Sequence, residues 1–152
     1  MKNNKEFKAQ LYTQLQAMLE SKVAATKEAI EAAKESRDNE TKSTAGDKYE
    51  TGRAMMQIEM EKNEVQLRNA LNLQNELSQI HIQKECIKVE QGSLVSTNYG
   101  NYFISIGLGK IEGTENAYAI SLASPIGMLL KDKTAGNKIL FQSREFAISD
   151  IV

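Results

Sequence analysis

Glycine and proline are almost absent from the first ninety residues of this 152-residue chain. Residues 4–36 contain neither, and the strong helix formers Ala, Glu, Lys, Gln and Leu dominate there. This segment is therefore predicted to form one long helix. At about 1.5 Å per residue it would be roughly 50 Å long, against about 30 Å for the diameter of a small domain. We expect such a helix to extend beyond any compact domain.

A second glycine-poor run follows a polar segment at residues 36–46, which is rich in turn and cap formers. The two runs each carry one narrow apolar stripe, interrupted in the second run by Asn63 and Gln74. Two long helices with a short connection predict an antiparallel coiled-coil hairpin over residues 1–79, with its tip at about residues 37–47. The stripes are Phe7, Leu11, Leu15, Leu19, Val23, Ile30 and Ala33, then Tyr49, Met56, Met60, Leu67, Ala70 and Leu77.

The composition changes after residue 90. Seven of the nine glycines and six of the nine aromatic residues lie in residues 91–152. Short strand-like runs at 94–97, 102–106, 117–122, 138–142 and 145–151 alternate with turn residues. Ser124 and Pro125 predict the start of one short helix, as N-cap and first helical residue. The chain is thus predicted to be α+β, with a small antiparallel β domain over residues 80–152 packed against the base of the hairpin.

Several classes of protein are disfavoured by simple counts. The net charge is -1, which argues against a dedicated duplex-binding protein and gives no sign of sequence-specific DNA binding. A single cysteine excludes an internal disulfide. Because the chain also has a single histidine, Cys86 and His81 form the only conceivable Cys–His pair. We interpret that pair as an inert thiol and a structural imidazole. No secretory segment or membrane-spanning stretch is seen, so a cytoplasmic protein is expected.

Residues 124–137 carry the most specific motif. The run Ser-Pro-Ile-Gly-Met-Leu-Leu-Lys-Asp-Lys-Thr-Ala-Gly-Asn resembles the C-terminal signature of the bacterial Gre-type transcript cleavage factors (GreA and GreB), SP-aliphatic-G/A-x-x-L-x-G-K-x-x-G-D. Tyr49 and Arg53 are similar to the family's E-Y-x-x-A-[RK] stretch after the hairpin tip. The plan of a hairpin followed by a β domain also resembles this family. The signature positions that match are Ser124, Pro125, Ile126, Gly127, Leu130, Lys133 and Gly136.

This resemblance implies a function in transcription elongation. It implies an FKBP-like C-terminal domain that docks on RNA polymerase without being an enzyme itself. It also implies that the hairpin enters the secondary channel, where tip acids help to hold Mg²⁺ at the polymerase active site during cleavage of backtracked RNA. Mg²⁺ commonly takes one or two carboxylates together with phosphates and water. No cofactor is expected on the chain itself, and nascent RNA is a further candidate contact.

The tip departs from the family pattern D-x-x-E-N-A-E-Y. Counted back from Tyr49, the two expected acidic positions fall on Lys42 and Ala45. Asp38, Glu40 and Asp47 are therefore candidate tip acids by location alone. The sequence leaves open whether the chain stimulates cleavage or occupies the channel and inhibits it.

Two alternatives remain. The hairpin could serve as a coiled-coil interaction or assembly module that does not act on polymerase, with oligomer contacts along its Leu, Ile and Met stripes. An independent enzyme would need a pocket in the β domain, for which Tyr99, Tyr102, Ser124 and Lys131 are the only candidate residues.

Overall fold

The computed structural model describes residues 4–43 and 47–152, with side chains described for 4–39 and 50–152. The fold is α+β. Helix α1 (Asn4–Ser43) and helix α2 (Asp47–Ser78) precede six strands and a short helix. The strands are β1 (Leu94–Thr97), β2 (Gly100–Ile104), β3 (Gly109–Lys110), β4 (Ala117–Ile120), β5 (Lys138–Phe141) and β6 (Arg144–Ile151), and helix α3 (Pro125–Leu130) lies between β4 and β5.

The chain divides into two compact units. One unit comprises residues 18–74, which are most of α1 and α2. The other comprises residues 1–17 and 75–152, so the first turns of α1 belong with the β-sheet. None of the helices in the described residues combines the length and the apolar character needed to cross a membrane.

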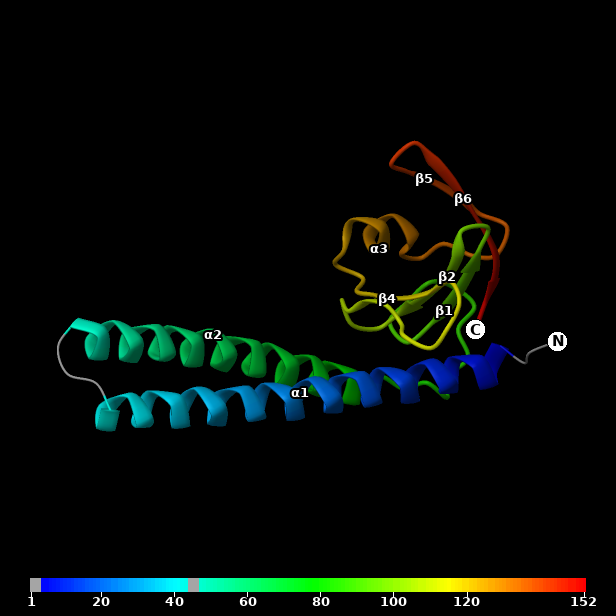
Figure 1. Ribbon diagram of the computed structural model, residues 1–152. Coiled ribbons are helices and arrows are strands. Elements are labelled where there is room, and N and C mark those ends of the chain that lie inside the picture. Colours follow the sequence, from blue (N-terminus) through cyan, green and yellow to red (C-terminus); the bar gives the residue numbers. More distant parts are fainter. Residues whose placement is uncertain (1–3, 44–46) are drawn as a thin grey trace. The chain divides into compact units, whose positions relative to one another are not determined.

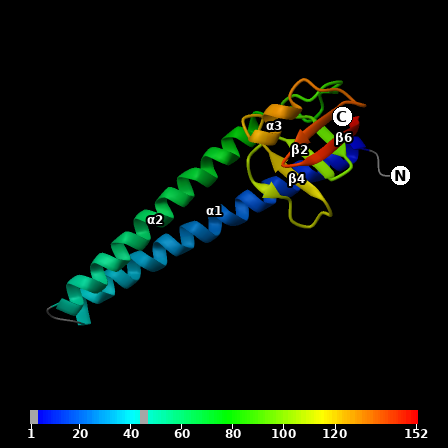
Figure 2. The same ribbon diagram turned by 90° about the horizontal axis from the view of Figure 1, so that it is seen from above.

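Within residues 18–74, α1 and α2 lie side by side, as Figures 1 and 2 show from two directions. The predicted stripe is buried only in part. The buried residues are Leu19, Thr26 and Ala33 on α1 and Met60, Asn63 and Ala70 on α2, whereas the other described stripe residues of this unit, Val23, Ile30, Met56 and Leu67, are half-buried. Only Leu19 and Met60 among these six buried residues are large and apolar. The seam therefore buries less apolar surface than a Leu-rich coiled coil does.

Helix α1 is longer than predicted. It continues through Ser43, whereas the sequence suggested a break near Ser36. No glycine or proline lies between these positions, and the polar residues that suggested a loop are tolerated on an exposed helix surface. The predicted tip segment, 37–47, is therefore helical up to Ser43, and α2 begins at Asp47 as predicted.

The sheet is mixed, in the order β3-β4-β2-β1-β6-β5. The expectation of a wholly antiparallel domain is wrong at one place, because β2 pairs with β4 in parallel, with Tyr102 opposite Tyr118 and Ile104 opposite Ile120. The chain between them contributes the two-residue strand β3, which pairs with β4 on its other side and was not predicted. The remaining pairs, β1 with β2, β1 with β6 and β5 with β6, are antiparallel as expected.

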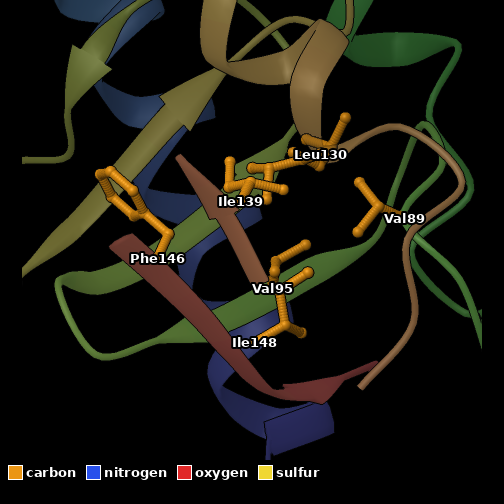
Figure 3. Close-up of a cluster of buried hydrophobic side chains, with 7 residues drawn as sticks. Val89, Val95, Leu130, Ile139, Phe146 and Ile148 are labelled. Atoms are coloured by element: carbon orange, nitrogen blue, oxygen red, sulfur yellow. The ribbon is translucent and has the colours of Figure 1, made fainter. Parts of the chain in front are cut away.

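The core of this unit lies between one face of the sheet and α3. It contains Val89, Val95, Ile104, Leu130, Ile139, Phe146 and Ile148 (Figure 3). Helix α3 packs against β5 and supplies Leu130, which is fully buried. In Figure 3 Phe146 lies at the opposite end of the cluster from Val89.

A buried lysine joins the first turns of α1 to the rest of the sheet unit. The Lys8 side chain is only 1% exposed, and its ammonium donates to the backbone carbonyl oxygens of Val152 at 3.0 Å and Lys84 at 3.3 Å. Asn4 also donates to Asp150, and the Tyr12 hydroxyl donates to the Leu77 carbonyl at 3.2 Å. The first turns of α1 are thus fixed to the segments that enter and leave the sheet.

Burial lowers the pKa of Lys8 from its ordinary value, although nearby Cys86 and Glu90 act in the opposite direction. The folded chain therefore releases this proton at a lower pH than the unfolded chain, whose lysine pKa is about 10.4. Stability contributed by Lys8 should rise as the pH increases through the lowered pKa toward that value.

This can be measured with Cys86→Ala and Cys86→Ala/Lys8→Met, in which the thiol no longer titrates. The free energy of unfolding of each variant is measured by urea titration at several pH values. The value for Cys86→Ala minus the value for the double variant is expected to increase from neutral to alkaline pH. A difference that stays constant or decreases over this range would contradict the assignment.

Candidate functional site

The described part of the hairpin end is organised around Arg37. Its guanidinium donates to the Gln57 side-chain oxygen at 3.0 Å, which joins α1 to α2, and its Nε lies 3.3 Å from the Asp38 carboxylate. Gln57 in turn donates to Glu61 at 3.3 Å. These contacts link side chains of the two helices near the end of the described hairpin. Arg37 was not among the residues predicted from the sequence, where its only signal is a cation close to the predicted end of the helix.

The candidate acids occupy helical positions. Asp38 and Glu40 lie in the last turns of α1, not in a loop, and Asp47 is the first residue of α2. The Asp38 side chain is exposed, while the side chains of Glu40, Asp47 and Tyr49 lie outside the described residues. Arg53 is an exposed residue of α2. Asp38 is thus an accessible carboxylate with an adjacent guanidinium.

Among residues 4–39 and 50–152, no three His, Cys, Asp or Glu side chains come together as a metal site. A single exposed carboxylate could still complete a Mg²⁺ site whose other ligands are phosphates, water and a partner's carboxylates. The described residues could therefore contribute one carboxylate, that of Asp38, to a Mg²⁺ site formed mainly by a partner.

The second candidate region is the segment of residues 124–137. Ser124 caps α3, because its hydroxyl accepts from the Gly127 amide at 3.0 Å and donates to the Ser121 carbonyl at 2.7 Å. Pro125 is the first helical residue, where a missing N–H costs nothing. Ile126 packs against the core cluster and Leu130 is buried within it. The motif residues Ser124 to Leu130 thus form a single structural element.

Gly127 can be replaced by no other residue without movement of the backbone. A Cβ there would lie 2.1 Å from the Ser121 carbonyl oxygen and 2.8 Å from the Ser124 hydroxyl oxygen. The glycine thereby allows α3 to start directly against the end of β4.

The turn after α3 contains two residues in the left-handed region. Asp132 has a φ of 65° and Gly136 a φ of 94°. The turn is held by hydrogen bonds from the Val89 amide to the Lys133 carbonyl at 2.8 Å and from the Asp132 amide to the Val89 carbonyl at 2.9 Å. The Asn137 side chain closes it by accepting from the Thr134 amide at 2.8 Å. The side chains of Lys131 and Lys133 are exposed.

The candidates for independent catalysis are not supported by this arrangement. The Ser124 hydroxyl is committed to the cap of α3. Burial raises the pKa of the Cys86 thiol, which is the opposite of what a nucleophilic cysteine requires, and the thiol donates to the Lys84 carbonyl. His81 is exposed. Tyr99 and Tyr102 belong to an aromatic group on the sheet that is described below.

Comparison with known proteins adds no assignment. Neither the models of protein families nor the curated proteins contain a match to this chain. The function must therefore be argued from the residues and their arrangement.

We expect Gly127→Ala to lower the free energy of unfolding by about 3 kcal/mol, because the new methyl group must displace backbone atoms. Gly107→Ala is the matched control, since a Cβ at Gly107 meets no atom within 4 Å. Its effect should stay within about 0.5 kcal/mol. Urea unfolding curves of both variants test this. Equal destabilisation of the two variants would contradict the prediction that the close contact at Gly127 excludes a side chain.

Proposed function

We propose that this chain is a Gre-like regulator of transcription elongation that binds RNA polymerase. In this proposal the sheet unit is an FKBP-like domain that docks on the polymerase, and the hairpin end enters the secondary channel to stimulate or inhibit cleavage of backtracked RNA. The chain is not an enzyme by itself, acts in the cytoplasm, and uses only the Mg²⁺ of the polymerase active site.

The observation that carries the proposal is the backbone of the turn at residues 132–137. The Gre-type signature has glycine at the positions of Asp132 and Gly136, and both residues here have the positive φ that favours glycine. Asp is one of the few other residues that tolerate this region. The signature's final acidic position is occupied by Asn137, whose side-chain oxygen accepts the hydrogen bonds that a carboxylate would also accept. The backbone therefore has the conformation that favours glycine at both signature positions, including position 132, where this chain has Asp instead.

The order of elements gives further support. Two long helices, a six-stranded mixed sheet and one short helix against a sheet face agree with the plan of a hairpin followed by an FKBP-like domain. Asp38 gives the hairpin end an exposed carboxylate. The altered spacing of the tip acids leaves stimulation and inhibition as two forms of the same proposal.

Direct binding to polymerase is the first test. At low salt and micromolar concentrations the chain is expected to co-migrate with core RNA polymerase in size-exclusion chromatography. Absence of a complex under these conditions would refute the proposal.

The second test uses a stalled, backtracked elongation complex. If the chain stimulates cleavage, Asp38→Ala/Glu40→Ala should reduce RNA shortening at least about tenfold, as expected when a metal-site carboxylate is lost. Glu28→Ala/Glu31→Ala removes the same charge from exposed positions of α1 and should leave the rate unchanged. Similar rates for both double variants would refute the role of Asp38 and Glu40. If the chain inhibits, it should instead slow the shortening caused by an added cleavage factor.

One observation favours the alternative of a coiled-coil assembly module. Met55, Ile58 and Val65 of α2 are between 50% and 65% exposed and lie within one arc of the helix. In that case the chain should form a concentration-dependent oligomer that Ile58→Lys abolishes, and it should not bind polymerase. Sedimentation equilibrium distinguishes this outcome from a monomer that binds polymerase.

A further inference from the structure

One face of the sheet carries a group of aromatic side chains. Helix α3 covers this face only in part, so some of these rings remain partly exposed. The rings of Tyr102 and Tyr118 are stacked, with centroids 5.5 Å apart. Phe146 lies 6.0 Å from Tyr102 and 4.8 Å from Tyr99. Phe141 lies 6.4 Å from Phe146. The five rings form a continuous aromatic group across β4, β2, β6, β5 and the β1–β2 turn, in which Phe146 is buried, Tyr99 is exposed and the other three rings are half-buried.

The strand registers explain this placement. Side chains two apart on a strand lie on the same face, so Tyr102 accompanies Ile104 and Tyr118 accompanies Ile120. Ile104 belongs to the buried core and Ile120 packs against it. The tyrosines lie two residues nearer the start of each strand, where Tyr102 and Tyr118 remain only half-buried.

Tyr99 is held in this group by its neighbour. The Asn98 side chain donates to the Glu145 carbonyl at 3.0 Å and accepts from the Ala147 amide at 2.8 Å. This pair of hydrogen bonds fastens the β1–β2 turn to β6, so that the ring of Tyr99, 42% exposed, rests against Phe146. These hydrogen bonds and the contact with Phe146 define the position of the Tyr99 ring beside β6.

Two cations lie beside the aromatic rings on this face, one on the edge strand β3 and one on β6. Lys110 of β3 is the cross-strand partner of Tyr118, and Arg144 of β6 lies over the Tyr99 ring at 5.6 Å from its centroid. Both side chains are exposed. Four strand spacings separate β3 from β6, which is about 19 Å.

Acidic residues are absent from this face among the six described strands. The registers place Lys110, Tyr118, Ile120, Tyr102, Ile104, Val95, Thr97, Ile148, Phe146, Arg144, Ile139 and Phe141 together. The carboxylates of Glu145 and Asp150 belong to the opposite face, since their strand neighbours are Leu140 and Ser96. The strands of this face therefore combine partly exposed rings with two cations, while Glu112 and Glu115 of the segment between β3 and β4 line the same hollow as Lys110.

We propose that the surface formed by the exposed ring of Tyr99 and the half-buried rings of Tyr102, Tyr118 and Phe141, with Lys110 and Arg144 beside them, binds single-stranded nucleic acid. Bases stack on aromatic rings with little sequence preference, and cationic side chains contact the phosphates. The separation of Lys110 from Arg144 accommodates several nucleotides. A duplex would not bind in this way, because its bases are already stacked on each other. This inference does not rest on the polymerase proposal, because the binding is tested with the chain alone.

The test is fluorescence anisotropy of labelled single-stranded oligouridine and oligothymidine, each about ten nucleotides long, titrated with the full chain. We expect micromolar dissociation constants at low salt, in the range of non-specific binding. Binding of either strand supports the proposal, and comparison of the two shows whether RNA or DNA is preferred. No rise in anisotropy up to about 100 μM for both strands, or equal binding of a duplex of the same length, would overturn it.

Arg144→Gln and Lys138→Gln form a matched pair. Both remove one positive charge from exposed positions of the neighbouring strands β6 and β5, but Lys138 lies on the face opposite to the rings. Arg144→Gln should weaken binding several-fold and reduce the slope of log affinity against log salt by about 0.7, the value for one phosphate contact on a single strand. Lys138→Gln should change neither. Equal losses in the two variants would indicate attraction by net charge alone and refute the proposal.

Tyr118→Leu tests the aromatic contribution while keeping an apolar side chain. Loss of one stacked base should weaken binding about tenfold, with the thermal midpoint measured in parallel to confirm folding. Arg144→Gln, at an exposed position, keeps the test valid if Tyr118→Leu does not fold. Displacement of the oligonucleotide by polyglutamate of similar length at equal concentration would show that any polyanion suffices, and would overturn the role of the rings.

Discussion

The parallel pairing of β2 with β4 determines how the sheet unit is built. Two parallel neighbours cannot be joined by a tight turn, so the chain between them makes a longer excursion and contributes β3 on the far side of β4. The same pairing sets Ile104 beside Ile120 and Tyr102 beside Tyr118. The isoleucine end then meets the helix that follows β4, while the tyrosine end is left at the surface. A one-residue shift in this register would turn every one of these side chains to the other face.

The start of α3 depends on this arrangement through Gly127 and Ser124. Helix α3 begins so close to the end of β4 that no side chain fits between them at Gly127. The Ser124 cap and the turn at Asp132 and Gly136 then bring Leu130 into the core and return the chain to β5. Because the turn is fastened to Val89, the segment entering the sheet and the segment leaving α3 are fixed together. The motif that suggested a family resemblance is thus also the structural link between α3 and the sheet.

The hairpin is held differently. Between residues 18 and 74 its buried seam contains two large apolar residues, Leu19 and Met60, while the other buried residues, Thr26, Ala33, Asn63 and Ala70, bury little apolar surface. A polar residue in such a seam fixes the register of the helices at some cost in stability. The contact from Arg37 to Gln57 adds a polar link near the end of the described hairpin. Both helices keep most of their surface in solvent, which agrees with their high content of charged residues.

The two long helices, the positions of most strands, and the cap and first residue of α3 could all be predicted from the amino-acid sequence. These features follow from local chemistry: the absence of helix breakers, alternation of side chains, and the preference of Ser and Pro for helix starts. The prediction failed at the end of α1, because polar residues that favour a loop are also acceptable on an exposed helix. Three features could not be predicted from the sequence: the parallel pairing, the buried ammonium of Lys8, and the grouping of Tyr99, Tyr102, Tyr118 and Arg144. These arise from contacts between residues far apart in the chain, whose partners only the tertiary structure decides.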